Sequence, residues 1–245
     1  MEFKEKIIAF VDILGWKDLV HDTELGICHS LPELVAIFDC FGTGKERDTF
    51  DKNGPPCCPA AAYNRRNLEF PLTQISDSAI ISAEILRAEV INLISYCWRA
   101  VHRLLEHGIM CRGYIKFGSV YHDERQIIGS GYQDAHAAER NVTACKREAD
   151  ERGTPYVQVD PAVVTCVERC NDPCVKTMYS RMTRNDGDSA ALLPFQRIKH
   201  HVVPEQPSGV GLYSRQRESN DDVRQRLLRY KERIESHGRI KRLTN

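Results

Sequence analysis

Two aspartates of the sequence stand where a carboxylate can do chemistry, because each one lies at the end of an apolar, strand-forming stretch. Asp12 follows residues 7–11, and Asp77 lies in a polar tip between two short β-prone segments. A charge beside an apolar core is costly unless something neutralises it. A divalent metal ion is one neutralising group. The other interpretation of Asp12 is a residue that ends a strand and caps the following helix.

The two aspartates and the main-chain carbonyl of Ile13 form a predicted oxygen site for two Mn²⁺ or Mg²⁺ ions. Such a sparse oxygen set leaves room for substrate phosphates, and two metals so held activate an attacking oxygen and stabilise a leaving one. Neither a Walker A loop nor a G-x-G-x-x-G fingerprint is present. We therefore predict phosphoryl chemistry by a metal pair. Backbone N–H groups of the following turn are expected to bind phosphate; the turn comprises Ile13, Leu14, Gly15 and Trp16.

The composition excludes several classes of partner. The 245 residues carry 34 basic and 34 acidic side chains, so no overall field attracts nucleic acid or a membrane surface. The start of the chain lacks the apolar stretch of a signal peptide, and no apolar run is long enough to span a bilayer. We therefore expect a cytoplasmic protein without nucleic-acid or membrane partners. The ten cysteines lack zinc-finger spacing and are expected to be reduced thiols.

Apolar periodicity predicts strands and helices in alternation. Loops with short strands are expected over residues 171–209. Helices that alternate with antiparallel hairpins predict an α+β fold, a ferredoxin-like palm whose antiparallel sheet carries helices on one face. The expected elements are a strand at 7–11, a helix at 31–41, a hairpin of 68–75 and 79–82, a helix at 84–107, a hairpin of 109–119 and 120–128, a helix at 132–151 and a strand at 156–159.

The chain is expected to form one catalytic domain over residues 1–210. Glycines and prolines interrupt the periodicity over residues 42–67, which predicts a loop insert within that domain. Residues 211–245 are expected to form a C-terminal tail with a polar helix at 218–236. That helix is either a solvated packing element or a dimer contact.

Four motifs resemble those of class III nucleotidyl cyclases, in the same order along residues 7–140. Phe-Val-Asp-Ile-Leu-Gly-Trp, around Asp12, looks like the first metal motif, and Gln-Ile-Ser-Asp-Ser, around Asp77, is similar to the hairpin with the second metal aspartate. Cys-Arg-Gly-Tyr-Ile-Lys-Phe-Gly resembles the strand with a triphosphate-binding arginine, here Arg112, whose other interpretation is an ion-paired surface residue. Residues 127–139 occupy the place of the catalytic helix.

The sequence departs from the class III pattern at four positions. The helix asparagine and the arginine that steadies the transition state correspond to Gln133 and Ala137. Gln133 keeps an amide for a ribose contact, whereas the missing charge falls to Arg140, for which a surface role is the alternative. The base-reading lysine and aspartate of adenylate cyclases correspond to Thr73 and Gln126, which are neutral.

The Ser-Asp-Ser hairpin, the Arg-Gly strand start and the Ala-x-Ala-x-Glu helix look most like the pyrimidine cyclases of bacterial antiphage defence (Pycsar systems). The resemblance implies a homodimer with composite active sites that converts UTP or CTP into a 3′,5′-cyclic monophosphate and pyrophosphate. It also implies a separate effector protein that senses the cyclic nucleotide. One glutamine amide serves either base by flipping, so the choice between UTP, which we prefer, and CTP stays open.

Three alternatives accompany this interpretation. An adenylate cyclase is disfavoured only by Thr73 and Gln126. A diguanylate cyclase shares the palm, but its Gly-Gly-Asp/Glu-Glu-Phe turn is replaced by Ser-Asp-Ser at Asp77. A catalytically inactive palm that senses nucleotide is favoured by Ala137 and disfavoured by retention of both aspartates beside the core.

Overall fold

The computed structural model describes residues 1–27, 29–42, 70–123, 125–145 and 154–193. Most of the predicted insert, the tail and its polar helix therefore lie outside the described residues. The elements are β1 (Lys4–Ile13), α1 (Trp16–Glu24), α2 (Leu31–Phe38), η1 (Asp39–Phe41), β2 (Leu72–Ile75), β3 (Ser78–Glu84), α4 (Arg87–Glu106), β4 (Cys111–His122), β5 (Ile127–Ile128), α5 (Ser130–Glu139), β6 (Val157–Val159), α6 (Pro161–Glu168), α7 (Pro173–Met182), β7 (Thr183–Asp186) and β8 (Ser189–Leu192).

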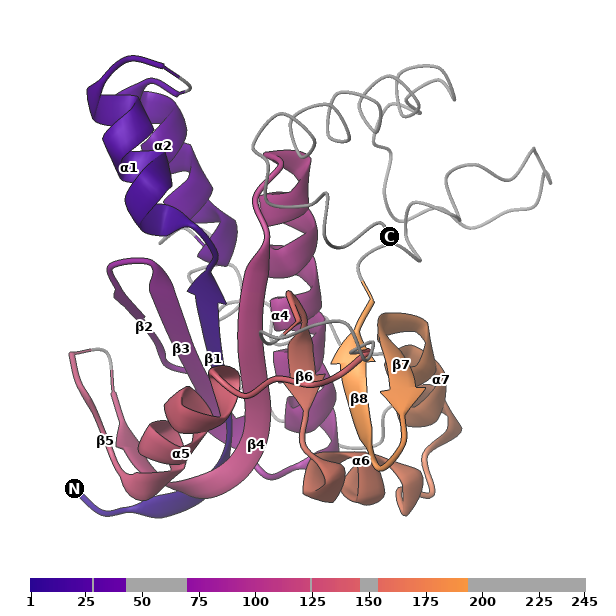
Figure 1. Cartoon of the computed structure of the whole chain (residues 1–245). Helices are drawn as coiled ribbons and strands as arrows, with labels where there is room; N and C mark the ends of the chain where they lie inside the picture. Colours follow the sequence, from indigo (N-terminus) through magenta and orange to yellow (C-terminus); the bar gives the residue numbers. More distant parts are fainter. Residues whose placement is uncertain (28, 43–69, 124, 146–153, 194–245) are drawn as a thin grey trace, which may run out of the picture.

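One sheet runs through the molecule in the order β2-β3-β1-β4-β6-β8-β7, and β5 pairs with β4 (Figure 1). The strands β2, β3, β1 and β4 are antiparallel neighbours. Their order along the chain, with helices after β1 and after the β2–β3 hairpin, gives the ferredoxin-like core. The predicted α+β fold is confirmed. The sheet is mixed rather than antiparallel throughout, because β4 and β6 run parallel.

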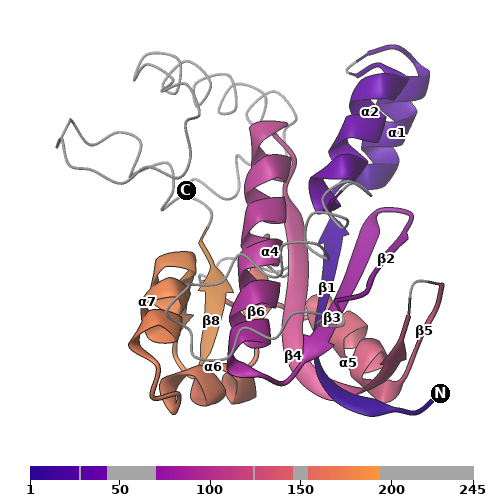
Figure 2. The ribbon, with the colours of Figure 1, turned by 180° about the vertical axis from the view of Figure 1, so that it is seen from behind.

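Both faces of β1 are buried. Helices cover both faces of the sheet (Figures 1 and 2). Ile7 and Ala9 belong to the main core with residues of α2, α4, α6 and α7. Ile8 and Phe10 point to the opposite face, where Ala135 of α5 packs. A strand buried on both sides has a continuous apolar sequence rather than an alternating one. The expectation of helices on one face therefore holds for α2, α4, α6 and α7 and is wrong for α5.

The helix α5 approaches the sheet through a contact between two glycines. A Cβ atom on Gly118 of β4 would lie 2.6 Å from the Cα atom of Gly131, and a Cβ atom on Gly131 would lie 2.5 Å from Cδ1 of Ile8. Real Cβ atoms do not come so close, so any larger residue would displace the helix. Backbone contact therefore fixes the position of α5 on the sheet.

The helices α6 and α7 are not predicted from the sequence. Both begin at an Asp-Pro pair, and the side chains of Asp160 and Asp172 accept hydrogen bonds from main-chain N–H groups two residues later. A capping aspartate with proline at the first helical position is a helix start signal. Both helix starts therefore have a local signal in the sequence, at Asp160-Pro161 and at Asp172-Pro173.

The prediction that the cysteines are reduced thiols is confirmed for six of the described cysteines and is wrong for one. Cys174 is disulfide-bonded, so the prediction of reduced thiols is wrong for this residue. The described cysteines that form no disulfide bond are Cys40, Cys97, Cys111, Cys145, Cys166 and Cys170. No helix in the described part of the chain is long and apolar enough to span a membrane.

Glu89 is a carboxylate buried in the first turn of α4, with 0% of its surface exposed. Its Oε1 atom accepts a hydrogen bond from Asn92 Nδ2 at 3.2 Å. Its Oε2 atom has no hydrogen-bond partner within the described residues. Burial raises the pKa of Glu89 from 4.5 to about 7, and the nearby charge of Glu84 acts in the same direction.

We expect Glu89→Gln to stabilise the protein at about pH 8 and not at about pH 4. Because the pKa is higher in the folded state, the folded chain keeps a proton that the unfolded chain loses between pH 4.5 and about 7. The free energy of unfolding therefore falls as the pH rises through this window, by on the order of 3 kcal/mol. Thermal unfolding at both pH values, with exposed Glu24→Gln as the control, measures the effect. An equal gain at both pH values would contradict it.

Candidate active site

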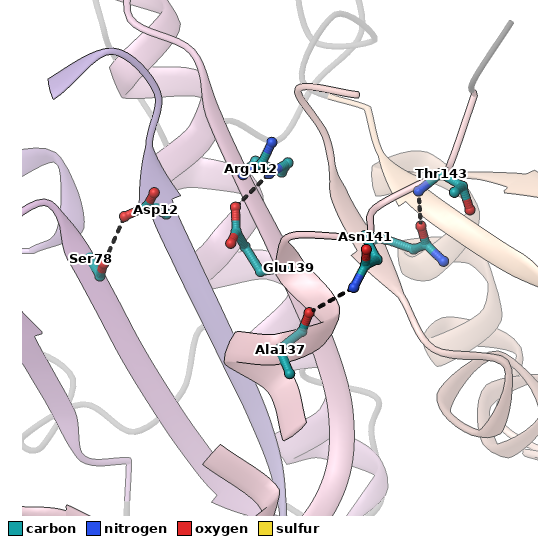
Figure 3. A network of polar contacts seen from close by, with 8 residues as sticks. Asp12, Ser78, Arg112, Ala137, Glu139, Asn141 and Thr143 are labelled. Carbon is teal, nitrogen blue, oxygen red and sulfur yellow. Dashed lines mark hydrogen bonds and ion pairs between the residues drawn. The ribbon is translucent and has the colours of Figure 1, made fainter. Parts of the chain in front are cut away.

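Three neighbouring strands bring Asp12, Ser78 and Arg112 into one row across the sheet. Asp12, near the end of β1, pairs in register with Ser78 of β3 and with Arg112 of β4. Cross-strand partners project from the same face of a sheet, and this is the face of Phe10 and α5. Ser78 Oγ donates a hydrogen bond to Asp12 Oδ1 at 2.7 Å (Figure 3). The row ends where the chain leaves the sheet for α1.

Main-chain hydrogen bonds join the second aspartate to this row. The N–H group of Ile13 donates to the carbonyl oxygen of Asp77 at 3.0 Å, which closes the β2–β3 turn against the end of β1. The charge of the Asp77 side chain contributes to the raised pKa of Asp12. The structure thus brings Asp12, Ile13, Asp77 and Arg112 together at one end of β1.

In the turn after Asp12, two of the four main-chain N–H groups predicted to bind phosphate are hydrogen-bonded within the protein. Gly15 has a φ of 76°, a left-handed conformation that glycine adopts without strain, and it turns the chain into α1. The N–H group of Leu14 already donates to the carbonyl of Met110 at 2.9 Å, as that of Ile13 does to Asp77. The N–H groups of Gly15 and Trp16 lie at the start of α1, where main-chain N–H groups have no acceptor within the helix. These two N–H groups are therefore the ones suited to bind phosphate.

Arg112 forms an ion pair with Glu139, the last residue of α5 (Figure 3). Arg112 Nε donates to Glu139 Oε1 at 2.5 Å, and the two side chains are 20% and 4% exposed. Glu139 is the glutamate of the Ala-x-Ala-x-Glu helix, and the sequence alone predicted no site role for it. Its signal is spacing, because Gly131, Ala135 and Glu139 lie four residues apart on the buried face of α5. An acid on such a face is rarely buried without a partner.

Burial is the main cause of a raised pKa at Asp12, and the charges of Asp77 and Glu139 add to it. The hydrogen bond from Ser78 and the charge of Arg112 lower the same pKa. Three carboxylates and one guanidinium leave a surplus of two negative charges when all are ionised. This surplus is the charge that one divalent cation neutralises.

The donor set fits Mg²⁺ or Mn²⁺ ions whose coordination is completed by water and substrate phosphate. Asp12, Asp77 and the carbonyl of Ile13 are the residues that would hold the two predicted ions, and hard cations of this kind take oxygen donors. Within the described residues, no three His, Cys, Asp or Glu side chains gather closely enough to hold a metal by themselves. Glu139 is therefore not a third ligand in the arrangement that the structure shows.

The predicted base-reading residues lie apart from the row. Thr73 lies on β2, which is separated from β1 by β3, and it pairs with Ile80. Its Oγ1 atom lies 2.9 Å from Nε2 of His122. His122 is 6% exposed, and its Nδ1 atom lies 2.9 Å from Ser82 Oγ. Gln126 is exposed in the turn after β4. His122 thus joins Thr73 to the β4–β5 hairpin.

Three other predicted residues lie outside the row. Gln133 and Arg140 are exposed on and just after α5, and within the described part of the chain neither side chain bonds to Asp12 or Asp77. The ring of Trp16 packs edge-on against Phe38 of α2, with the ring centroids 4.4 Å apart. The structure therefore gives the Trp16 side chain a packing role between α1 and α2.

We expect Ser78→Ala to raise the pKa of Asp12 further, because the lost hydrogen bond stabilises the ionised carboxylate. Metal binding needs that ionised form. Titration calorimetry with Mn²⁺ at a series of pH values should show that, as the pH falls, affinity begins to decline at a higher pH than in the wild type. Ser180→Ala, an exposed hydroxyl on α7, is the control. An unchanged pH profile would show that Ser78 does not tune Asp12.

Comparison with known proteins identifies neither a matching family model nor a matching curated protein. Among solved structures, the chain is similar to the catalytic core of a rhodopsin-guanylyl cyclase with converted specificity in complex with ATPalphaS (TM-score 0.43, 11% identity, 69% of this chain and 85% of that one). It is also similar to two structures of a bacterial light-regulated adenylyl cyclase (TM-scores 0.40 and 0.41, 14% identity, 78% of this chain). The chain covers 51% of each of the latter. At these identities and TM-scores, none of the likenesses assigns an activity to the chain.

Proposed function

We propose that the chain is a nucleotidyl cyclase that converts a pyrimidine nucleoside triphosphate, UTP or CTP, into its 3′,5′-cyclic monophosphate and pyrophosphate. The observation that carries the proposal is the group of Asp12, Asp77 and Arg112 at the end of β1. Two carboxylates with surplus negative charge bind divalent ions, and a guanidinium beside them binds phosphate. A metal-bound triphosphate satisfies both requirements.

In this mechanism, Asp12, Asp77 and the carbonyl of Ile13 would hold the Mn²⁺ or Mg²⁺ ions, which would supply charge neutralisation and lower the pKa of the ribose 3′-hydroxyl. Arg112 binds the triphosphate, and the N–H groups of Gly15 and Trp16 at the start of α1 bind a phosphate oxygen. The 3′-oxygen forms a bond to the α-phosphorus and gives up its proton to solvent. The bond from the α-phosphorus to the bridging oxygen breaks, and pyrophosphate leaves. Positioning and charge neutralisation provide the rate enhancement.

The pyrimidine specificity is supported by the sequence resemblance and by the neutral pair Thr73 and Gln126. Neither residue supplies the charge of the adenine-reading pair. The rest of the resemblance leads to the biological proposal: a cytoplasmic enzyme whose product, cyclic UMP or cyclic CMP, is a second messenger of antiviral defence sensed by a separate effector.

A homodimer with composite active sites is part of the proposal. Gln133 and Arg140 are exposed and do not bond to the aspartates of their own chain within the described residues. On an exposed helix surface they are available to a second copy of the chain. Arg140 would then supply the charge that Ala137 lacks.

Incubation of the purified protein with Mn²⁺ and each of the four nucleoside triphosphates, followed by mass spectrometry, tests the activity. We expect a cyclic monophosphate from UTP or CTP alone. A cyclic purine product would retain the mechanism and remove the defence assignment. Nucleotide binding without any product would indicate a sensor instead of an enzyme.

Asp77→Ala should lower turnover by on the order of 100-fold or more, because the metal site loses one of its two carboxylates. The melting temperature should change little, since the side chain lies in a turn and not in the core. Asp188→Ala, in the exposed β7–β8 turn, is the matched control. Activity retained in Asp77→Ala would remove the two-metal mechanism.

A further inference from the structure

We propose that Glu139 is a positioning residue that orients Arg112 for the phosphate groups of the substrate. The inference rests on the proposed function for the identity of the ligand. Its structural basis is the 2.5 Å contact between Arg112 Nε and Glu139 Oε1 (Figure 3). A guanidinium has five N–H donors, and this contact uses the single one on Nε. The four N–H groups on the terminal nitrogens are those suited to bidentate binding of a phosphate.

The two partners of this ion pair differ in exposure. The side chain of Glu139 is 4% exposed, whereas that of Arg112 is 20% exposed. The carboxylate is thus the fixed, inner partner, and the guanidinium is the outer partner that solvent and a ligand reach. A buried carboxylate without its partner would be strongly unfavourable, so the pair holds Arg112 in one orientation.

The position of Glu139 is itself fixed by the backbone. Gly131 contacts Gly118 of β4 at a distance that admits no side chain, and Glu139 lies two turns later on the same buried face. Ala135, 0% exposed, occupies the turn between them. The carboxylate therefore reaches Arg112 from a helix that has little freedom to shift.

The charge of Glu139 alone does not account for its presence in the site. A negative charge beside Arg112 opposes the binding of a triphosphate, and it also raises the pKa of Asp12. A direct metal contact is not its role in this arrangement, because the described residues contain no three-ligand cluster. Orientation of Arg112 is the contribution that offsets this repulsion.

Binding of inorganic tripolyphosphate with Mn²⁺, measured by titration calorimetry, separates orientation from charge. Glu139→Gln keeps an oxygen acceptor for Arg112 Nε and loses the repelling charge, so it should bind at least as tightly as the wild type. Glu139→Asp keeps the charge but is one methylene shorter, and Glu139→Leu has no acceptor. Both should bind about tenfold more weakly.

The chain provides a matched control in a second ion pair between β4 and α5. Lys116 Nζ lies 3.0 Å from Asp134 Oδ2, and the Asp134 side chain is 60% exposed. Asp134→Asn and Asp134→Leu should leave tripolyphosphate affinity within about twofold of the wild type, because an exposed pair contributes little. If Glu139→Leu does not fold, the comparison of Glu139→Asp with Glu139→Gln still decides the question.

Two results would overturn the inference. Tighter binding in Glu139→Leu as well as in Glu139→Gln would mean that Glu139 acts only through its charge. Unchanged affinity in all three variants with a lowered melting temperature would mean a purely structural role.

In turnover assays, we expect Glu139→Asp to raise KM more than it lowers kcat, since Arg112 binds the triphosphate. Phosphate binding that depends on Glu139, without cyclic product from any nucleotide, would refute the proposed function and leave this inference standing.

Discussion

The structure depends on the burial of β1 on both of its faces. The strand pairs with β3 along one edge and with β4 along the other. The helix α4 packs on one face of the strand and α5 packs on the opposite face. Residues 7–11 are at most 4% exposed, so the strand has almost no freedom to move. Asp12 follows immediately and is held by this rigid support at the point where the core gives way to solvent. A rigid strand end places a charged group more accurately than a loop does.

The site depends on a balance between carboxylate charges, whose ionised form burial disfavours, and the groups that compensate them. Asp12 is deprived of solvent and lies near two further carboxylates, while Arg112 and the hydroxyl of Ser78 partly compensate. The protein alone does not complete this compensation. Because the folded chain keeps this surplus of negative charge, binding of a cation stabilises the site. Cation binding and the local stability of the site are therefore coupled.

The sequence predicts the elements whose signals are local. The apolar run before Asp12, the hairpin around Asp77 and the periodicity of α4 are all readable within one element, and the structure contains all three. The parallel β4–β6 pairing and the packing of α5 depend on contacts between distant segments. No local signal identifies the partners of Glu139 and His122, because those partners come from other elements. Periodicity identifies a buried face but not the side chain that it meets.

The contact between Gly131 and the sheet has a consequence for the order of folding. Gly131 meets Ile8, which lies about half the chain length earlier in the sequence, and Gly118 of a strand that must already be paired. The pairing of β1 with β4 spans a similar separation, because Lys4 pairs with Val120, so both contacts require a long loop to close. The helix contacts β1 and β4 together, so its seat on the sheet exists only after these two strands have paired. A nascent chain that has formed its sheet therefore has Asp12 in place before Glu139 reaches Arg112, so an incompletely folded molecule does not yet have the complete site.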